Sequence, residues 1–292
     1  MSKTDETLVE SAPVASAPVR RVRQGPVMPI GGAEDKDGDN ETILSRFVEL
    51  AGGKKAKIVV IPTASQEAEE MGQRYIDVFG KLGAASVEVV DIKERPDANA
   101  PATLDLLGSA TGIFITGGAQ DRLVSLLVGT LAMECIRERN AEGVVVAGTS
   151  AGASIVAAHV MLGGTGLAGN SNDSAARKAM VDVAAGFGLL QDVIVDQHFS
   201  QRGRMGRLLS AFASNPGLVG IGLDEDTAVL IDREGTLEVL GSGMVTIIDG
   251  RNANSDYFDI QPGDVLTVVD SSLHVLSAGH RFDLNERRPI RN

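Results

Sequence analysis

The sequence predicts an α/β protein with a doubly wound, mostly parallel sheet, helices on both faces and a C-terminal antiparallel β-meander. From Lys57 to Glu225, short runs of β-branched residues alternate with longer amphipathic segments. Continuous apolar runs of about five residues between amphipathic helices are typical of parallel strands buried on both faces. After Glu225, apolar and polar residues alternate between turn residues, which predicts antiparallel strands.

The expected elements follow from these two periodicities in chain order. Runs rich in Val and Ile predict strands, and apolar residues spaced three and four apart predict helices. Strands are expected at 57–63, 86–92, 112–118, 144–147, 192–198 and 218–223, and helices at 69–83, 121–139 and 151–161. The meander is expected to use turns such as Arg233-Glu234-Gly235 and Asp249-Gly250.

Length and composition favour one globular domain, 26–292, preceded by a disordered tail, 1–25, that is rich in Ser, Ala and Pro. The net charge of −12 argues against general binding to nucleic acid or to an anionic membrane. A single cysteine, Cys135, rules out an intramolecular disulfide and suits a reducing compartment. The tail lacks the apolar run of a signal peptide, even after the pair Arg20-Arg21, so a cytoplasmic location is expected.

The segment 142–164 carries no charged residue after its first and is long enough to cross a bilayer. Its many Gly, Ser and Thr residues instead favour a buried strand, a tight turn and a helix. The turn GTSAGAS lacks the spacing and the lysine of a phosphate-binding loop, which leaves nucleotide binding as a minor alternative.

Residues 148–152 match the pattern G-x-S-x-G, with Ser150 at its centre. Small flanking residues between a strand and a helix allow a sharp turn that exposes the serine and directs the next N–H at an oxyanion. A serine hydroxyl needs a base, and the base usually needs a group that orients it. We therefore expect a nucleophile at Ser150, provided that these partners are present.

The chain has four histidines, of which His198 is the best candidate for the base. It ends a strand whose carboxyl end is expected at the same sheet edge as the serine turn. By contrast, His159 is expected too far along the helix after Ser150, and His274 and His280 lie in the meander. For the acid, the run LDEDT supplies Asp224, Glu225 and Asp226, among which the pattern alone does not choose.

Five blocks in the same order, PIGGAEDK, FITGGAQDRL, AGTSAGA, VDQHFSQRGRMGRL and GIGLDEDTAV, resemble the cyanophycinase family. The resemblance covers nearly the whole chain except the tail. It implies a serine peptidase with a fold like that of class I glutamine amidotransferases. It also implies a homodimer that hydrolyses cyanophycin, a polyaspartate carrying arginine on its side chains, to β-aspartyl-arginine.

The resemblance also implies site residues. Ser150 would be the nucleophile, His198 the base and Glu225 the orienting acid, with the N–H groups of Gly118 and Ala151 forming the oxyanion hole. Substrate-pocket positions would be Gln120, Asp196, Gln197, Arg202, Arg204 and Arg207. A substrate that alternates guanidinium and carboxylate groups makes sense of clustered arginines beside an acid, although a solvated helix start would also place arginines here.

No cofactor or metal is expected, because the sequence has no zinc-type cluster of His and Cys. Two alternatives stay open. One is a dipeptidase for aspartyl or isoaspartyl peptides with the same triad. The other is a non-catalytic binding protein in which GTSAGA only turns the chain.

Overall fold

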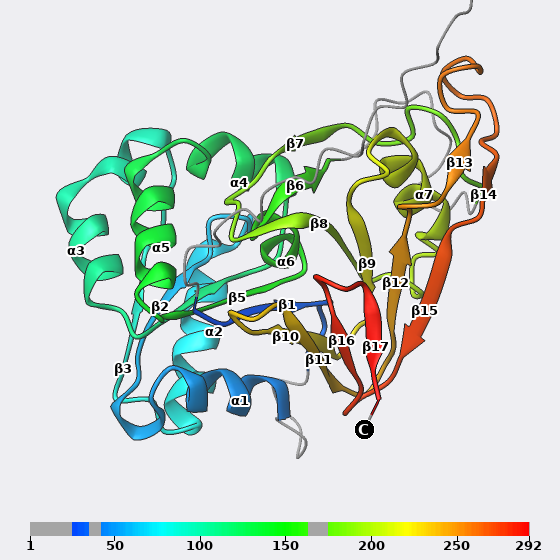
Figure 1. Ribbon diagram of the computed structural model, residues 1–292. Coiled ribbons are helices and arrows are strands. Elements are labelled where there is room, and N and C mark those ends of the chain that lie inside the picture. The colour runs from blue at the N-terminus through cyan, green and yellow to red at the C-terminus, as the bar shows by residue number, and fades with distance from the viewer. Residues whose placement is uncertain (1–24, 35–41, 163–174, 292) are drawn as a thin grey trace, which may run out of the picture.

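The computed structural model describes residues 25–34, 42–162 and 175–291, and Figure 1 shows their arrangement. Most strands of this described part form two sheets. The larger has nine strands in the order β17-β16-β11-β10-β1-β5-β4-β2-β3. Its strands are β1 (Val27–Ile30), β2 (Lys57–Ile61), β3 (Ser86–Val89), β4 (Gly112–Ile115), β5 (Val145–Thr149), β10 (Thr227–Ile231), β11 (Thr236–Gly241), β16 (Arg281–Asp283) and β17 (Arg288–Ile290).

The half of this sheet formed by β1, β5, β4, β2 and β3 is parallel, as the sequence predicts. Five helices contribute buried residues that pack on it, together with the short α6 after Ser150. The helices of the described chain are α1 (Thr42–Leu50), α2 (Ala68–Lys81), α3 (Pro101–Ser109), α4 (Gln120–Leu127), α5 (Leu131–Ala141), α6 (Ala151–Ile155) and α7 (Met205–Ser214), with 3-10 turns at Gly53–Lys55 and Arg95–Asn99.

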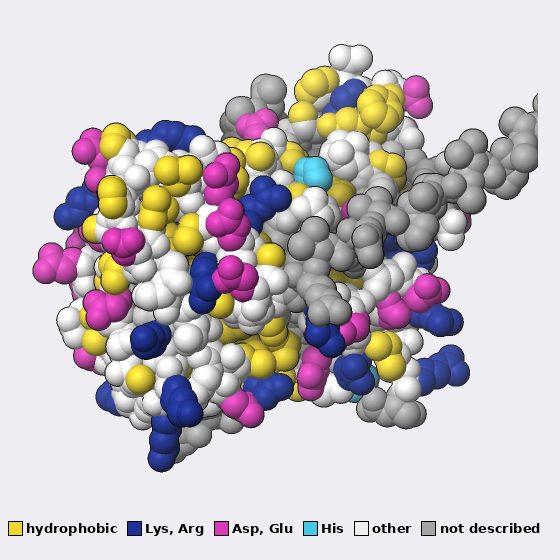
Figure 2. Space-filling view, turned by 60° about the vertical axis from the view of Figure 1, so that its left-hand side comes forward, with side chains coloured by type: hydrophobic (Ala, Val, Ile, Leu, Met, Phe, Trp, Pro, Cys, Tyr) yellow, Lys and Arg dark blue, Asp and Glu magenta, His cyan; other side chains and the backbone are white. Residues whose placement is uncertain are grey.

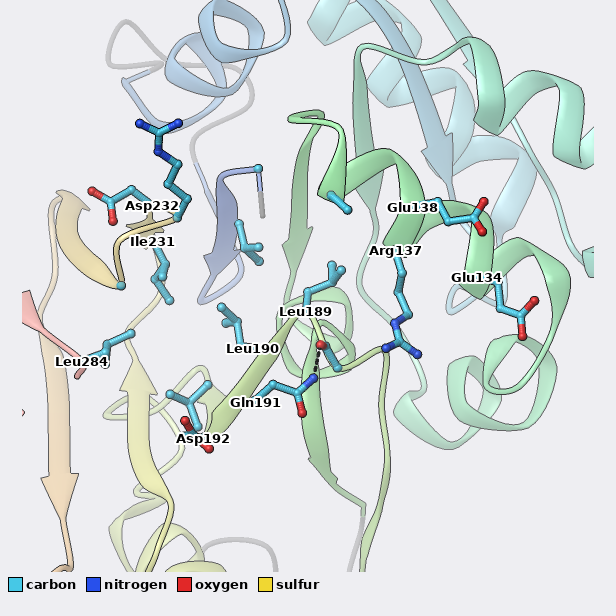
Figure 3. Close-up of a pocket in the computed structure, with 17 residues that line it drawn as sticks. Glu134, Arg137, Glu138, Leu189, Leu190, Gln191, Asp192, Ile231, Asp232 and Leu284 are labelled. Carbon is cyan, nitrogen blue, oxygen red and sulfur yellow. Dashed lines mark hydrogen bonds between the residues drawn. The ribbon is translucent and has the colours of Figure 1, made fainter. Parts of the chain in front are cut away.

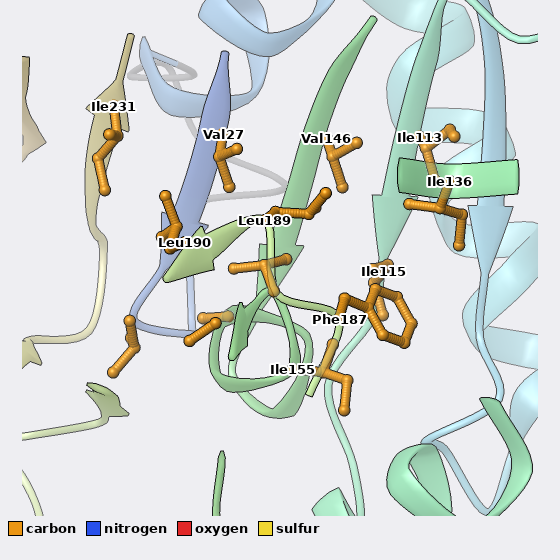
Figure 4. Packing of buried hydrophobic residues seen from close by; sticks show 14 of the residues in the cluster. Val27, Ile113, Ile115, Ile136, Val146, Ile155, Phe187, Leu189, Leu190 and Ile231 are labelled. Carbon is orange, nitrogen blue, oxygen red and sulfur yellow. The ribbon is translucent and has the colours of Figure 1, made fainter. Parts of the chain in front are cut away.

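Alternation along the parallel strands divides the core between the two faces. Phe114 packs with α1 and α2 on one face, in a cluster that includes Phe47 and Tyr75. Its neighbours Ile113 and Ile115 point to the other face, where α3 to α6 and the second sheet pack (Figure 4). Strands that are apolar on both sides are therefore buried on both sides.

The second sheet has six strands in the order β15-β12-β9-β8-β6-β7. The predicted α/β fold with a parallel sheet core is confirmed, but the expectation that one sheet contains all the strands before the meander is wrong. The 192–198 strand and the meander strands β12 and β15 belong to the second sheet, whereas β10 and β11 extend the first. The strands are β6 (Ala157–Met161), β7 (Val183–Ala185), β8 (Leu190–Gln197), β9 (Val219–Leu223), β12 (Val245–Asp249) and β15 (Ser272–Leu276), with a separate pair β13 (Asn254–Ser255) and β14 (Val268–Val269).

Two helix predictions need correction. The expected helix 121–139 is two helices, because the chain turns at Gly129, whose φ is +72°, and Thr130 caps α5. The expected helix 151–161 ends at Ile155, and the next residues form β6, which pairs in parallel with β8. A short apolar run fits either a helix or a strand, and here pairing with the second sheet decides.

None of the described helices is long and apolar enough to cross a membrane. The expected disordered tail lies outside the described residues, apart from Gly25. On the face that Figure 2 shows, Lys and Arg side chains lie among Asp and Glu rather than in one basic patch.

Candidate active site

Ser150 lies in a sharp turn between β5 and α6. Its backbone has φ 53° and ψ −115°, a conformation that L-residues rarely adopt. The two glycines of the motif make this turn possible: a Cβ on Gly148 would overlap the carbonyl oxygen of Gly152, and a Cβ on Gly152 would overlap that of Ile115. The G-x-S-x-G spacing is therefore a steric requirement of this turn.

A chain of hydrogen bonds links Ser150 to a histidine and an acid. The Oγ of Ser150 is 2.9 Å from Nε2 of His198, and Nδ1 of His198 is 2.6 Å from Oε1 of Glu225. An ionised carboxylate only accepts hydrogen bonds, so Nδ1 carries the proton and Nε2 of a neutral ring is free to accept the serine proton. His198 is buried, whereas the side chain of Glu225 is partly exposed.

The pKa of His198 is lowered from its ordinary value of 6.5. Burial is the largest cause, and the nearby charges of Arg202 and Arg204 act in the same direction. The hydrogen bond and the charge of Glu225 oppose them. A lowered pKa keeps the imidazole neutral at pH 7, which is the form that a general base requires.

Both sheets supply this site. Ser150 follows β5 of the larger sheet and His198 follows β8 of the smaller one, while Glu225 lies in the turn by which the chain passes from β9 to β10, between the sheets. The expectation that the serine and histidine follow strands of one sheet is wrong. They meet because the carboxyl ends of β5 and β8 point to the same region between the two sheets.

The structure distinguishes the three neighbouring acids. Asp224 accepts hydrogen bonds from the backbone N–H groups of Ser200 and Met244, and Asp226 accepts one from the hydroxyl of Ser242. Glu225 is the member of the set that is hydrogen-bonded to His198.

The two expected oxyanion donors flank the serine turn. Ala151 is the first residue of α6, so its N–H has no acceptor within the helix. Gly118 lies between β4 and α4 with φ +143°, and a Cβ there would overlap the carbonyl of Ala64. A Cβ on the preceding Gly117 would come within 2.9 Å of Cβ of Ser150, which shows how closely this loop approaches the serine.

The expected substrate-pocket positions fall into two groups. Asp196 is fully buried and binds two guanidinium groups: Arg204 at 3.1 Å and Arg207 through two hydrogen bonds of 3.0 and 3.1 Å. Burial lowers the pKa of Arg204 to about 10, although the Asp196 carboxylate opposes this shift. Arg202, by contrast, is exposed beside His198.

Of the two expected glutamines, Gln197 lies close to Ser150, and Gln120 begins α4. Oε1 of Gln197 is 3.4 Å from Oγ of Ser150. Gln120 is the first residue of α4, and its buried Nε2 has no hydrogen-bond partner within the described part of the chain.

The remaining histidines and the cysteine lie elsewhere. His159 belongs to β6, not to a helix, and His274 packs on the ring of Phe282. His280 is hydrogen-bonded to Ser277, and Cys135 is half-buried in α5 with its pKa raised by burial. Across residues 25–34, 42–162 and 175–291, no group of His, Cys, Asp and Glu side chains could hold a metal ion.

A cavity of about 500 Å³ (Figure 3) is lined by the first residues of β1 and β8, whereas Ser150 follows the last residue of β5. Apolar side chains such as Leu189, Leu190 and Ile231 line it, and Glu134, Arg137 and other charged residues surround them. None of the expected site residues lines this cavity.

A serine in a strained turn, a histidine of lowered pKa and a carboxylate together define a serine hydrolase. The chain belongs to peptidase family S51, whose family model matches residues 27–239. It is therefore a serine-type peptidase.

The chain is similar to several curated relatives. It is 44% identical over 263 residues to the cyanophycinase of Trichormus variabilis, covering 89% of this chain and 86% of the relative. It is 40% identical to the cyanophycinase of Geminocystis herdmanii, covering 90% and 95%. The crystal structure of a peptidase from an acI-B1 Actinobacterium matches 90% of the chain with a TM-score of 0.66 at 23% identity, which shows a shared fold.

Proposed function

We propose that this protein is a serine exopeptidase that hydrolyses cyanophycin to β-aspartyl-arginine dipeptides. The observation that carries the proposal is the hydrogen-bond chain from Ser150 through His198 to Glu225. The similarity to curated cyanophycinases over most of the chain supports the choice of substrate.

In the proposed mechanism, Ser150 attacks an aspartyl backbone carbonyl while Nε2 of His198 takes the hydroxyl proton. The oxyanion accepts hydrogen bonds from the N–H groups of Gly118 and Ala151. His198 then gives its proton to the departing amine, which leaves an acyl-enzyme. Water, deprotonated by His198, then attacks the ester carbonyl, and His198 returns the proton to Oγ of Ser150 as the ester bond breaks. The charge of Glu225 stabilises the imidazolium in both steps.

We propose that the arginines recognise the carboxylates of the substrate. Planar guanidinium groups bind carboxylates through paired hydrogen bonds. Arg202 is exposed beside His198 and suits direct contact, whereas Asp196 holds Arg204 and Arg207 in fixed orientations. Gln120 and Gln197 are the proposed polar contacts. The unpartnered Nε2 of Gln120 supports a contact with substrate oxygen.

The test uses purified protein and its Ser150→Ala variant with insoluble cyanophycin. We expect the native protein to clear the polymer and release β-aspartyl-arginine, and the variant to lose activity by a factor of at least about 10⁴. Ser125→Ala, which changes an exposed serine on α4, is the matched control. Native protein that leaves the polymer intact but cleaves short aspartyl or isoaspartyl peptides would support the dipeptidase alternative. A variant as active as the native protein would contradict the proposed nucleophile.

A second pair of variants tests the roles of the base and the acid. We expect His198→Ala to reduce kcat about as much as Ser150→Ala, because the serine loses its base. Glu225→Gln removes the charge that stabilises the imidazolium and should cost about 10²- to 10⁴-fold. If Glu225→Gln retains full activity, the acid must be sought at Asp224 or Asp226.

We also propose a cytoplasmic homodimer whose larger sheet is arranged as in class I glutamine amidotransferases. The parallel order of β1, β5, β4 and β2 supports the last point, and a lone half-buried cysteine suits a reducing compartment. Light scattering of the purified protein tests the dimer directly.

A further inference from the structure

The loop that follows β1, residues 31–34, contacts every segment of the candidate triad. It contains part of the PIGGAEDK block, for which the proposed mechanism has no role. Three successive backbone carbonyls accept hydrogen bonds from the three segments: Ile30 from Ser150 (2.9 Å), Gly31 from His198 (2.9 Å) and Gly32 from Asp226 (2.8 Å). One short stretch of backbone therefore sets the relative positions of groups that come from two sheets.

Only glycine fits at the centre of this loop. A Cβ on Gly31 would overlap the carbonyl oxygen of Asp224. Gly32 has φ +103°, and a Cβ there would overlap the ring of His198. The loop backbone thus forms part of the surface that buries the imidazole.

A buried carboxylate anchors the end of the loop. Glu34 is 3% exposed; its Oε2 accepts a hydrogen bond of 2.6 Å from the hydroxyl of Thr149, and its Oε1 one of 2.5 Å from Tyr75. Burial and the neighbouring Glu34 carboxylate raise the pKa of Tyr75 well above its ordinary value, so Tyr75 remains a donor. Hydroxyl-to-carboxylate hydrogen bonds are among the stronger ones in proteins.

Thr149 is the last residue of β5, directly before Ser150, whose backbone is strained. The Glu34–Thr149 hydrogen bond therefore joins the loop that bears on His198 to the turn that bears Ser150. Ala33, with φ 47°, lies between this anchor and Gly32 and holds a left-handed conformation that needs support from its surroundings.

We propose that Glu34 is a positioning residue of the peptidase site: through Thr149 and the 31–34 loop it fixes the serine turn against His198. The inference rests on the proposed function, since it assigns Glu34 a role in the same reaction.

The experiment measures kcat and KM for cyanophycin and, separately, the rate at which a fluorophosphonate probe labels Ser150. We expect Glu34→Gln to lower kcat and the labelling rate about 10- to 100-fold with KM changed less than about threefold, as for loss of a hydrogen bond to a charged group. Glu88→Gln, at an exposed carboxylate on the outer strand β3, is the matched control and should leave both rates unchanged.

Thr149 provides variants that leave the Glu34 carboxylate in place, in case Glu34→Gln does not fold. Thr149→Val removes the hydroxyl at nearly constant shape and should reproduce the loss of labelling, whereas Thr149→Ser retains a hydroxyl and should restore most of it. Tyr75→Phe removes the hydrogen bond that Glu34 accepts from Tyr75 and should lower the melting temperature with less effect on labelling. Equal labelling losses in Thr149→Ser and Thr149→Val would overturn the inference.

The pH profile of labelling separates positioning from simple loss of stability. If Glu34→Gln releases the loop, the ring of His198 becomes less buried and its pKa rises towards its ordinary value, so the acid limb of the profile moves to higher pH. The charges near the ring, Glu225, Arg202 and Arg204, are unchanged. An unshifted profile with unchanged labelling overturns the inference. Wild-type protein that labels at Ser150 but leaves cyanophycin intact contradicts only the proposed substrate, and wild-type protein that does not label contradicts both.

Discussion

Two buried aspartates of the six-stranded sheet, near opposite ends of its strand β9, each bind two arginines, but they connect different parts of the molecule. Asp196 is the second-last residue of β8, and it binds Arg204, the N-cap residue of α7, and Arg207 in the first turn of that helix. Asp249 ends β12 and binds Arg251 and Arg287. Arg287 lies 38 residues further along the chain, in the turn between β16 and β17 of the other sheet.

The same interaction, one carboxylate that binds two arginines, can therefore orient side chains at the candidate active site or join the two sheets. Asp196 and its two arginines lie within 11 residues of one another in the chain. The cluster lies next to Gln197 and His198 and orients guanidinium groups beside them. The cluster around Asp249 joins the larger sheet to the smaller one, and Arg287 also donates to the carbonyl of Gly217 just before β9. We therefore expect the first to govern activity and the second to govern stability.

The largest effect that this comparison predicts comes from Asp196→Asn. Removing the charge leaves two nearby guanidinium groups without their carboxylate, one of them buried. We expect kcat/KM for cyanophycin to fall at least about 100-fold and the free energy of unfolding to fall by about 3–5 kcal/mol. Steady-state kinetics and urea unfolding measure the two quantities. If Asp196→Asn retains the native kcat/KM, the Asp196 cluster does not belong to the active site.

Asp249→Asn should reduce stability but leave activity almost unchanged. One of the two arginines around Asp249, Arg251, is 48% exposed, so solvent screens part of this cluster. We therefore expect a stability loss of about 2–4 kcal/mol, with kcat/KM within about twofold of the native value. A loss of activity that exceeds the loss of folded protein would contradict the scaffold role.

The pH dependence of stability gives a second test of Asp249. Burial alone would raise its pKa, but hydrogen bonds from Arg287 and Arg251 outweigh burial and lower the pKa. A group with a depressed folded pKa stabilises the protein above its unfolded pKa, about 3.9, and loses this contribution as pH falls through the folded value. Acid unfolding of the Asp249→Asn variant should therefore be less steep below about pH 4 than that of the native protein.

Arg202→Ala should shift the pH dependence of Ser150 labelling and change the labelling rate only moderately. The Arg202 charge lowers the pKa of His198, so its removal raises that pKa and moves the acid limb of Ser150 labelling by fluorophosphonate to higher pH. Labelling does not require cyanophycin, so any loss of substrate binding is measured separately as a rise in KM. A limb that stays in place would show that the charge of Arg202 does not affect the pKa of His198.

The smallest effect is expected for Arg233→Ala. Its ion pair with Glu234 is exposed in the turn between β10 and β11, where solvent screens the charges. We expect no measurable change in melting temperature or kcat. A clear loss of stability would show that exposed ion pairs, and not only the buried clusters at Asp196 and Asp249, stabilise this protein.

Much of the candidate site could be predicted from the sequence because its parts occupy short motifs. G-x-S-x-G indicates a turn that only small residues allow, and the contacts of Gly148 and Gly152 give the steric reason. The position of His198 at the end of an apolar run predicts that it lies near the serine turn. The pair Gly31-Gly32 is evident in the sequence, but the close approach of Gly32 to the ring of His198 could not be predicted, because the two residues are far apart in the chain.

The features that can be predicted without the structure are local: the alternation of strand and helix periods, the serine turn and the segments that carry His198 and the acids. Tertiary structure alone decided that the strands form two sheets and that Glu225, rather than Asp224 or Asp226, contacts the histidine. It also decided that residues 157–161 form a strand. The reason is physical, because periodicity records which side of an element is buried, whereas sheet membership and side-chain pairing depend on partners distant in the chain.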